Sequence, residues 1–504
     1  MINNQDSNLY NVDTVDHLVQ DSLACFYEQA FDVLAGGQVF LDSWYIGYLA
    51  EHLEAFEKKE IQFLNIEMPP RMGKTALCNV AFSTRYMGKY PDRRVISASF
   101  SAELSKEIHS MCRSITNKTW YKRAFPKFNI NSTSSLFKED QNETKNTQSV
   151  FVTTKGGYRL AASAEGSITG KGGDIIISDD IMDPKQVLSQ ADNDRIISWI
   201  RSTLFSRFNN KKEGQWLNIQ QRLADNDFSG TFIDDKWTTV KIPMKARQSK
   251  IYSFGNVTKL VKRGQFLEPR RYGENELKKD IKDMGSKAVE AQYFQETEPD
   301  NGEVFKKEWF KYWMFLPKMD HYAIYADTAS KEGRNNDYTV FMCWGMLYRD
   351  GRKYAYLIDI YRDKVTTPKL LKASKEFWLK HLNNEHKSPL IKFAIEDKSS
   401  GIGLIQLLEA ESNIPVTKLI ADKDKVSRAT DILPRMESGQ VLFPKNAPFM
   451  GILEKELLKF SSKKNNNKKD QVDTLTYAIR DLLFDPQDDK NTPLNYSALI
   501  NELN

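Results

Sequence analysis

Short apolar stretches recur along the first half of the chain, and each is followed by a polar turn. Residues 61–66, 93–99, 175–177 and 216–220 are such stretches, and segments with helical periodicity lie between them. Strands that alternate with helices are typical of a parallel sheet. The first half is therefore expected to be an α/β domain. Residues 41–56 form a further periodic helix, in which Trp44 and Tyr45 are interpreted as core residues rather than as a platform for a base.

The pattern changes after residue 320, where strands follow one another directly. Residues 322–327, 338–345 and 354–361 are predicted strands, 393–396 is a fourth, and a helix is expected over 474–483. This order predicts a second α/β domain. The expected organisation is a first domain at 1–245 with a helical extension at 1–40, a connector at 246–315, a second domain at 316–485 and a flexible tail at 486–504.

Composition excludes some classes of protein but does not identify this one. The chain has 504 residues, with 72 basic and 67 acidic side chains and a net charge of +5, so nucleic-acid binding is permitted but not indicated. Its four cysteines form no CxxC pair, which favours a reducing compartment over a structural zinc site. We expect no membrane span and no secretory signal, because no long apolar run occurs.

The clearest chemical motif follows the first predicted strand. Gly73, Lys74 and Thr75 lie between a turn at Pro69–Met72 and a segment that can start a helix. Backbone N–H groups at such a turn bind phosphate, the lysine reaches the β- and γ-phosphates, and the threonine hydroxyl binds Mg²⁺. Residues 70–75, namely Pro70, Arg71, Met72, Gly73, Lys74 and Thr75, are therefore predicted to bind ATP with Mg²⁺. Met68 stands where the usual motif has its first glycine.

Two further strand ends carry matching chemistry. Asp179 and Asp180 follow the apolar strand 175–177, and Gln220 and Gln221 follow the strand that begins at Trp216. We assign Asp179 to the metal and Asp180 to the general base that deprotonates the attacking water. Gln221 is expected to sense the γ-phosphate. Paired carboxylates alone are often helix caps, and their distance from the phosphate loop is what favours a nucleotide hydrolase.

Three segments together resemble the large terminase subunit of tailed bacteriophages. They are residues 68–75, 170–180 and 219–230, and the resemblance runs from about residue 40 to 485. It implies an N-terminal P-loop ATPase of the ASCE type with a mostly parallel sheet, and a C-terminal RNase H-like nuclease with a mixed sheet. It also implies that Arg71 stabilises charge on the γ-phosphate.

The same resemblance implies a nuclease that uses two Mg²⁺ or Mn²⁺ ions. The matching acids are Asp327 first, Glu396 or Asp397 second, and Asp470 third, with Asp473 one turn further as the alternative. Successive side chains of a strand point to opposite faces, so only one of these two is expected to face the metals, and Glu396 is preferred from its spacing to Gly401. Carboxylates are the ligands that hard divalent ions select.

The resemblance also predicts partners. They are double-stranded DNA, the portal of the procapsid, a small terminase subunit and further copies of this chain in a ring, expected to be a pentamer. The setting would be the cytoplasm of the infected bacterium, transiently at the portal, and not the mature virion. Lys423, Lys425 and Arg428 could contact DNA phosphates. A repair or defence ATPase–nuclease, and a scaffold without enzyme activity, are the competing hypotheses.

Overall fold

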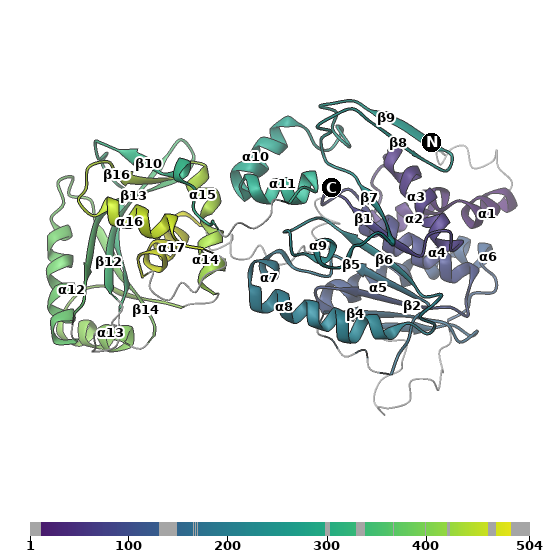
Figure 1. The fold of residues 1–504 in the computed structure, drawn as a ribbon, viewed down its shortest axis with the longest axis horizontal. Coiled ribbons are helices and arrows are strands. Elements are labelled where there is room, and N and C mark those ends of the chain that lie inside the picture. The colour runs from purple at the N-terminus through teal and green to yellow at the C-terminus, as the bar shows by residue number, and fades with distance from the viewer. Residues whose placement is uncertain are drawn as a thin grey trace. The chain divides into compact units, whose positions relative to one another are not determined.

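The computed structural model describes most of the chain as two compact units (Figure 1). The first contains residues up to 277 and 287–297, and the second contains residues 278–286 and those from 303 onward. The predicted tail at 486–504 lies outside the described residues. The described ranges are 12–130, 149–164, 166, 168, 170–297, 303–328, 338–365, 367–398, 400–420, 424–461 and 470–484.

The first unit is built on a seven-stranded sheet with the order β3-β4-β2-β5-β6-β1-β7. All neighbouring strands are parallel except β3 and β4, which form the hairpin predicted around Gly156 and Gly157. The sheet is therefore mostly parallel, as predicted. Its strands are β1 (Phe63–Glu67), β2 (Arg94–Ser99), β3 (Val150–Val152), β4 (Tyr158–Ser163), β5 (Ile175–Asp179), β6 (Gln215–Gln220) and β7 (Trp237–Lys241).

Helices cover both faces of this sheet, which explains why its strands read as continuous apolar runs. Ile175 and Ile177 of β5 join the core under α1 to α6, whereas Ile176 joins the core under α7 to α9. The helices are α1 (Val12–Asp21), α2 (Leu23–Leu34), α3 (Trp44–Glu57), α4 (Phe82–Lys89), α5 (Ala102–Thr116), α6 (Thr119–Ala124), α7 (Pro184–Leu188), α8 (Gln190–Trp199) and α9 (Phe228–Phe232). A π-helical turn, η1 (Ala76–Ala81), precedes α4, and η3 (Ile200–Leu204) and η4 (Phe205–Arg207) follow α8.

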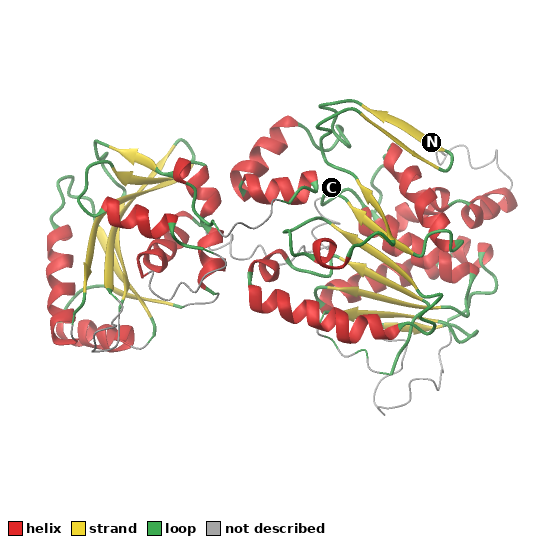
Figure 2. Ribbon diagram, in the orientation of Figure 1, coloured by secondary structure: helices red, strands yellow, loops and turns green. Residues whose placement is uncertain are grey.

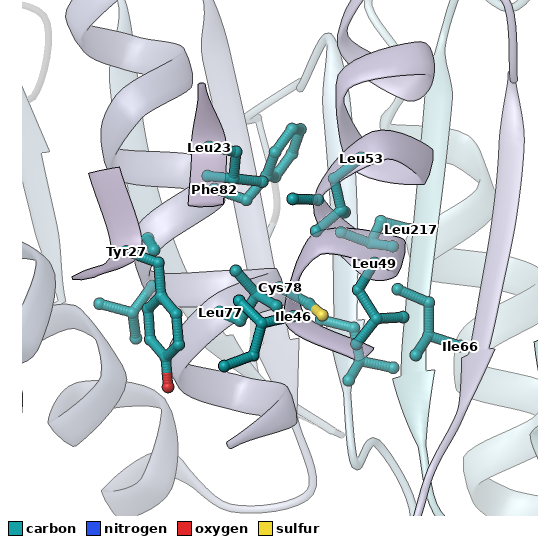
Figure 3. Close-up of a cluster of buried hydrophobic side chains, with 14 of the residues drawn as sticks. Leu23, Tyr27, Ile46, Leu49, Leu53, Ile66, Leu77, Cys78, Phe82 and Leu217 are labelled. Carbon is teal, nitrogen blue, oxygen red and sulfur yellow. The ribbon is translucent and has the colours of Figure 1, made fainter. Parts of the chain in front are cut away.

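Figure 3 shows the core between β1 and the helices α2, α3 and η1. Leu23, Leu49 and Leu53 are fully buried there beside Ile66 of β1. Fully burying one such side chain stabilises a fold by about 1.5–3 kcal/mol. This packing holds the predicted phosphate loop, which follows β1, against the rest of the unit.

Residues assigned from the sequence to a connector carry their own structure. A two-stranded hairpin, β8 (Lys250–Phe254) and β9 (Val257–Val261), packs on α3 through Trp44 and Tyr252, whose ring centroids are 4.8 Å apart. Two helices follow, α10 (Glu274–Met284) and α11 (Ser286–Phe294). The backbone of Met244 donates to the carbonyl of Tyr293 at 2.7 Å, so the end of α11 is tied to the first unit.

The second unit has a mixed seven-stranded sheet with the order β10-β16-β13-β12-β11-β14-β15. Figure 2 draws its strands in yellow and the helices beside them in red. Strands β11, β12 and β13 are antiparallel neighbours, and the remaining pairs are parallel. The mixed sheet agrees with the predicted fold class. Its strands are β10 (Lys311–Trp313), β11 (His321–Asp327), β12 (Thr339–Arg349), β13 (Arg352–Asp363), β14 (Leu390–Glu396), β15 (Val416–Leu419) and β16 (Val441–Pro444).

Helices also cover both faces of the second sheet. Alternate residues of β11 separate the two cores: Tyr325 packs with α14 to α17, and Ile324 packs with α12 and α13. The helices are α12 (Thr367–Leu382), α13 (Ser400–Glu411), α14 (Lys425–Asp431), α15 (Leu433–Glu437), α16 (Met450–Leu458) and α17 (Asp470–Leu483), with a short 3₁₀ turn, η5 (Lys307–Trp309). Among the helices of the described residues, none combines the length and the apolar character that crossing a bilayer requires.

Candidate active sites

The first site lies at the carboxyl edge of the parallel sheet. Strand β6 separates β1, which leads into the phosphate loop, from β5, which ends in Asp179. The carboxyl ends of parallel strands meet at one edge, so the loop, Asp179 and the residues after β6 come together there. Within the loop, Gly73 has φ of 76° and Arg71 has φ of 60°. A left-handed arginine is unusual, and strained backbone of this kind is typical of ligand-binding loops.

Lys74 and Thr75 contact the polar side chains that were predicted at the ends of the neighbouring strands. The Lys74 ammonium donates to Gln221 Oε1 at 2.9 Å and lies 3.1 Å from Asp180 Oδ2. The Thr75 hydroxyl donates to Asp179 Oδ1 at 3.1 Å. All five side chains are buried. The structure therefore brings together the lysine, the threonine, both aspartates and the glutamine that the sequence places on three separate segments.

The two aspartates differ in their surroundings. Burial raises the pKa of Asp179 to about 7, and the neighbouring Asp180 adds to this effect, whereas hydrogen bonds from Asn79 and Thr75 and the charge of Lys74 oppose it. Asp180 has φ of 43°, and its Oδ1 accepts the backbone N–H of Gln221 at 3.3 Å. A buried carboxylate with a raised pKa binds a cation readily, because the cation replaces the lost hydration.

The residues around the loop fit a nucleotide with Mg²⁺. Neighbouring oxygen ligands of an octahedral Mg²⁺ are about 3 Å apart, and Thr75 Oγ1 and Asp179 Oδ1 have that separation. Pro70 is half-buried and Arg71 is exposed. Met72 and Gly73 line a small pocket with aromatic and aliphatic walls; its other lining residues are Tyr27, Phe31, Phe40, Leu41, Tyr45, Ile46, Leu49, Leu77 and Arg271.

The second site lies where β11, β14 and α17 meet. Asp327 ends β11, and its pKa is raised well above the usual range by burial and by the charges of Asp473, Glu396 and Asp470. Strands β11 and β14 are parallel neighbours, so Asp327 and Glu396 end at the same edge. Asp470 begins α17 and accepts the backbone N–H of Tyr338 at 2.9 Å. These four carboxylates come from three segments far apart in the sequence, since Asp470 and Asp473 share the first turn of α17.

The sequence left Glu396 or Asp397, and Asp470 or Asp473, as alternative metal ligands. The structure gives these side chains different exposure and different partners. Glu396 is half-buried and accepts the hydroxyl of Tyr477 at 2.9 Å, whereas Asp397 is exposed. Asp473 is buried and paired with two cations, Arg428 at 2.6 Å and Lys425 at 2.7 Å.

The pairing of Asp473 with Arg428 and Lys425 bears on the prediction that Lys423, Lys425 and Arg428 contact DNA phosphates. Arg428 is buried against Asp473, so it is not placed to contact DNA phosphates, and this part of the prediction is wrong. Lys423 lies outside the described residues. Lys425 is partly exposed and also pairs with Asp473.

The acids of the second site do not form a closed coordination shell. Across the described part of the chain, no three acidic, histidine or cysteine side chains are gathered closely enough to hold one metal ion. The donors nevertheless are all carboxylate oxygens, which fit Mg²⁺ or Mn²⁺ and not a soft metal. A cluster of carboxylates with an acid whose pKa is raised by the others favours binding of divalent cations.

Sequence reasoning missed the side chains that hold these acids. Asn79 donates to Asp179, and Tyr477 donates to Glu396. Arg222, by contrast, was expected with Gln220 and Gln221 at the end of its strand, and it pairs with the buried Asp227 at 2.9 Å. The only signal for Asn79 was its position five residues after Lys74, in the segment predicted to be helical.

One family model matches residues within the second unit. Residues 324–482 match the family model of the terminase RNase H-like domain. A search of curated proteins found no match.

Solved structures of large terminases resemble the chain over most of its length. The large terminase of the thermophilic bacteriophage D6E in complex with ADP is 13% identical, with coverage of 87% of this chain and 99% of that chain and a TM-score of 0.47. The HK97 bacteriophage large terminase is 13% identical, covering 90% and 98%, with a TM-score of 0.33. The large terminase nuclease of phage G20c with bound magnesium is 18% identical, covering 36% and 98%, with a TM-score of 0.27. The family match shows that residues 324–482 form a terminase RNase H-like domain, and the resemblance to the terminase large subunit is confirmed there.

Proposed function

We propose that this chain is the large subunit of a phage terminase, in which ATP hydrolysis drives double-stranded DNA into a procapsid and an endonuclease cuts concatemeric DNA. The observation that carries the proposal is the set of buried contacts of Lys74 and Thr75 with Gln221, Asp179 and Asp180, in one chain with a terminase RNase H-like domain. The first unit supplies a nucleotide site, and the second supplies the acids of a nuclease.

In the motor, each contact of Lys74 has a consequence for binding. Lys74 must exchange Gln221 and Asp180 for the β- and γ-phosphates, which releases both side chains toward the attacking water. Asp180 then serves as general base. Thr75 and Asp179 would hold Mg²⁺, which when bound neutralises charge on the phosphates. Arg71, exposed at the loop, stabilises charge on the γ-phosphate.

In the nuclease, Asp327, Glu396 and Asp470 would hold two Mg²⁺ or Mn²⁺ ions, which when bound activate a water and stabilise the leaving oxygen. Asp473 instead anchors Arg428 and Lys425 beside the site. The proposed partners are double-stranded DNA, the portal, a small terminase subunit and further copies of this chain in a ring. The proposed setting is the cytoplasm of the infected bacterium, transiently at the portal, and not the mature virion.

The test measures ATP hydrolysis and DNA cleavage of the purified full chain with Mg²⁺ or Mn²⁺. Lys74→Met should abolish hydrolysis, and the matched control Lys59→Met, at an exposed lysine of the same unit, should not. Asp327→Asn should abolish cleavage and preserve hydrolysis, while Asp350→Asn, an exposed acid of the second unit, preserves both.

Two results would contradict the proposal. Wild-type protein that hydrolyses no ATP would remove the motor. Protein that hydrolyses ATP and cuts DNA but fills no procapsid, when supplied with portal and small subunit, would favour the repair or defence ATPase–nuclease.

A further inference from the structure

Asn79 lies beneath the nucleotide site with every polar atom of its side chain engaged. It belongs to the π-helical turn η1, a rare conformation that is found mostly at functional sites. Its amide Nδ2 donates to Asp179 Oδ2 at 3.0 Å and to Ser97 Oγ at 3.0 Å. Its Oδ1 accepts from Arg159 Nη2 at 3.0 Å and from Ser97 Oγ at 3.2 Å. All four side chains are buried.

Arg159 determines which way the Asn79 amide faces. A guanidinium only donates hydrogen bonds, so the amide oxygen must face Arg159, and the NH₂ group must then face Asp179. A reversed amide would set donor against donor at Arg159 and acceptor against acceptor at Asp179. In a buried setting each such mismatch costs the desolvation of an unpaired polar group. Arg159 thereby selects the one orientation that binds the carboxylate.

Arg159 is itself held in place without an acidic partner. Its side chain is fully buried, donates to Ser83 Oγ at 3.2 Å, and meets His109 Nδ1 at 3.3 Å. His109 is neutral, since burial and the charges of Arg159 and Arg113 lower its pKa to about 2, so Nδ1 accepts. Among the described residues, no carboxylate forms an ion pair with Arg159. A hydrogen-bonded path therefore runs from Arg159 through the amide of Asn79 to Asp179.

The geometry points to Asn79, with Arg159, as a positioning residue that orients Asp179 for the Mg²⁺ of the nucleotide. Because Asn79 occupies Oδ2 of Asp179, Oδ1 is directed to the Thr75 hydroxyl, where the ion would bind. The inference rests on the proposed ATPase function and adds to it a polar relay that extends from β4 to the metal position. Loss of such an outer partner typically weakens metal affinity or activity by about 10–100-fold.

The test uses Asn79→Leu and Arg159→Met in the full chain. The control is Asn218→Leu, a fully buried asparagine on β6 that bonds to Asn65 and Ser178 rather than to Asp179. The first readout is ADP affinity, measured by calorimetry with EDTA and with rising Mg²⁺. The second is the Mg²⁺ concentration that gives half-maximal ATP hydrolysis.

Asn79→Leu should bind ADP with normal affinity in EDTA. The Mg²⁺ concentration that it needs, both to strengthen ADP binding and to reach half-maximal ATP hydrolysis, should rise by about tenfold or more. Arg159→Met should shift the same readouts in the same direction by less, and Asn218→Leu should shift neither. An unchanged Mg²⁺ requirement in Asn79→Leu overturns the inference. If that variant does not fold, an unchanged requirement in Arg159→Met overturns it. Wild-type protein without ATP hydrolysis refutes the motor, while the Mg²⁺ dependence of ADP binding still decides the role of Asn79.

Discussion

Glu57→Gln should destabilise the first unit far more than the same change at another glutamate. Glu57 is buried at the end of α3, where its two oxygens lie 2.7 Å from Arg85 and 2.6 Å from Lys89. Arg85 is also buried and donates to the carbonyls of Gln20 and Asp21 at the end of α1. This cluster ties α1, α3 and α4 together behind the phosphate loop.

The magnitude follows from what the substitution leaves behind. Glutamine keeps the size of Glu57 but removes its charge, so the Arg85 guanidinium stays buried without a counter-charge. Breaking a buried ion pair on one side costs about 3–5 kcal/mol. With a denaturant slope of about 3 kcal/mol per molar urea, the unfolding midpoint of the first unit should fall by about 1–1.7 M.

Hydrogen exchange of β1 and β2 at increasing urea, followed by mass spectrometry, reports this unit separately from the second. The matched control is Glu213→Gln, because Glu213 pairs with Lys59 at 2.9 Å with both side chains well exposed, and exposed pairs contribute little. The reasoning is refuted if both variants shift the midpoint equally, or if the midpoint of β11 in the second unit falls as far as that of β1.

In metal-free protein, Asp179→Asn should raise the thermal midpoint more at about pH 8 than at about pH 5. The folded-state pKa of Asp179 is raised to about 7, whereas an unfolded aspartate titrates at about 4, so the wild-type protein loses stability progressively as pH rises from the lower value to the higher one. Equal shifts at both pH values would count against this. Tyr477→Phe should slow DNA cleavage about tenfold or more and spare ATP hydrolysis, since it removes the donor to Glu396; cleavage at the wild-type rate would exclude that support. Gln221→Leu should lower kcat for ATP hydrolysis with little change in ADP binding, because Gln221 contacts Lys74 before phosphate binds; an effect on ADP affinity alone would place it in ground-state binding instead.

Much of the fold was predictable because the signals are local. The apolar run of β5 and the polar residues that end it are written in consecutive positions, and a parallel sheet buried on both faces requires such runs. Lys74, Thr75 and Asp179 could be predicted from local signals too, since the first two belong to the Gly-Lys-Thr run between a turn and a helix and Asp179 follows a predicted strand. The Asp327 end of β11 was equally clear.

The partners of these residues were decided by the tertiary structure. Strand order inserts β6 between β1 and β5, and only that order brings Gln221 to Lys74. The hydrogen bond from Tyr477 to Glu396, and the inward turn of Arg428 toward Asp473, depend on packing between segments far apart in the chain.

The sequence by itself determined which elements form and which of them end in chemically active groups, because hydrophobic periodicity and turn residues act over a few positions. The tertiary structure alone decided which groups meet. Arg159 carries no local signal, and Asn79 carries only its position after Lys74, since an asparagine in a helix and an arginine in a strand are ordinary surface residues until the sheet buries them together. Burial removes water from both, so Arg159 must donate to protein acceptors, among them the Asn79 amide oxygen, and the Asn79 NH₂ group must donate to Asp179.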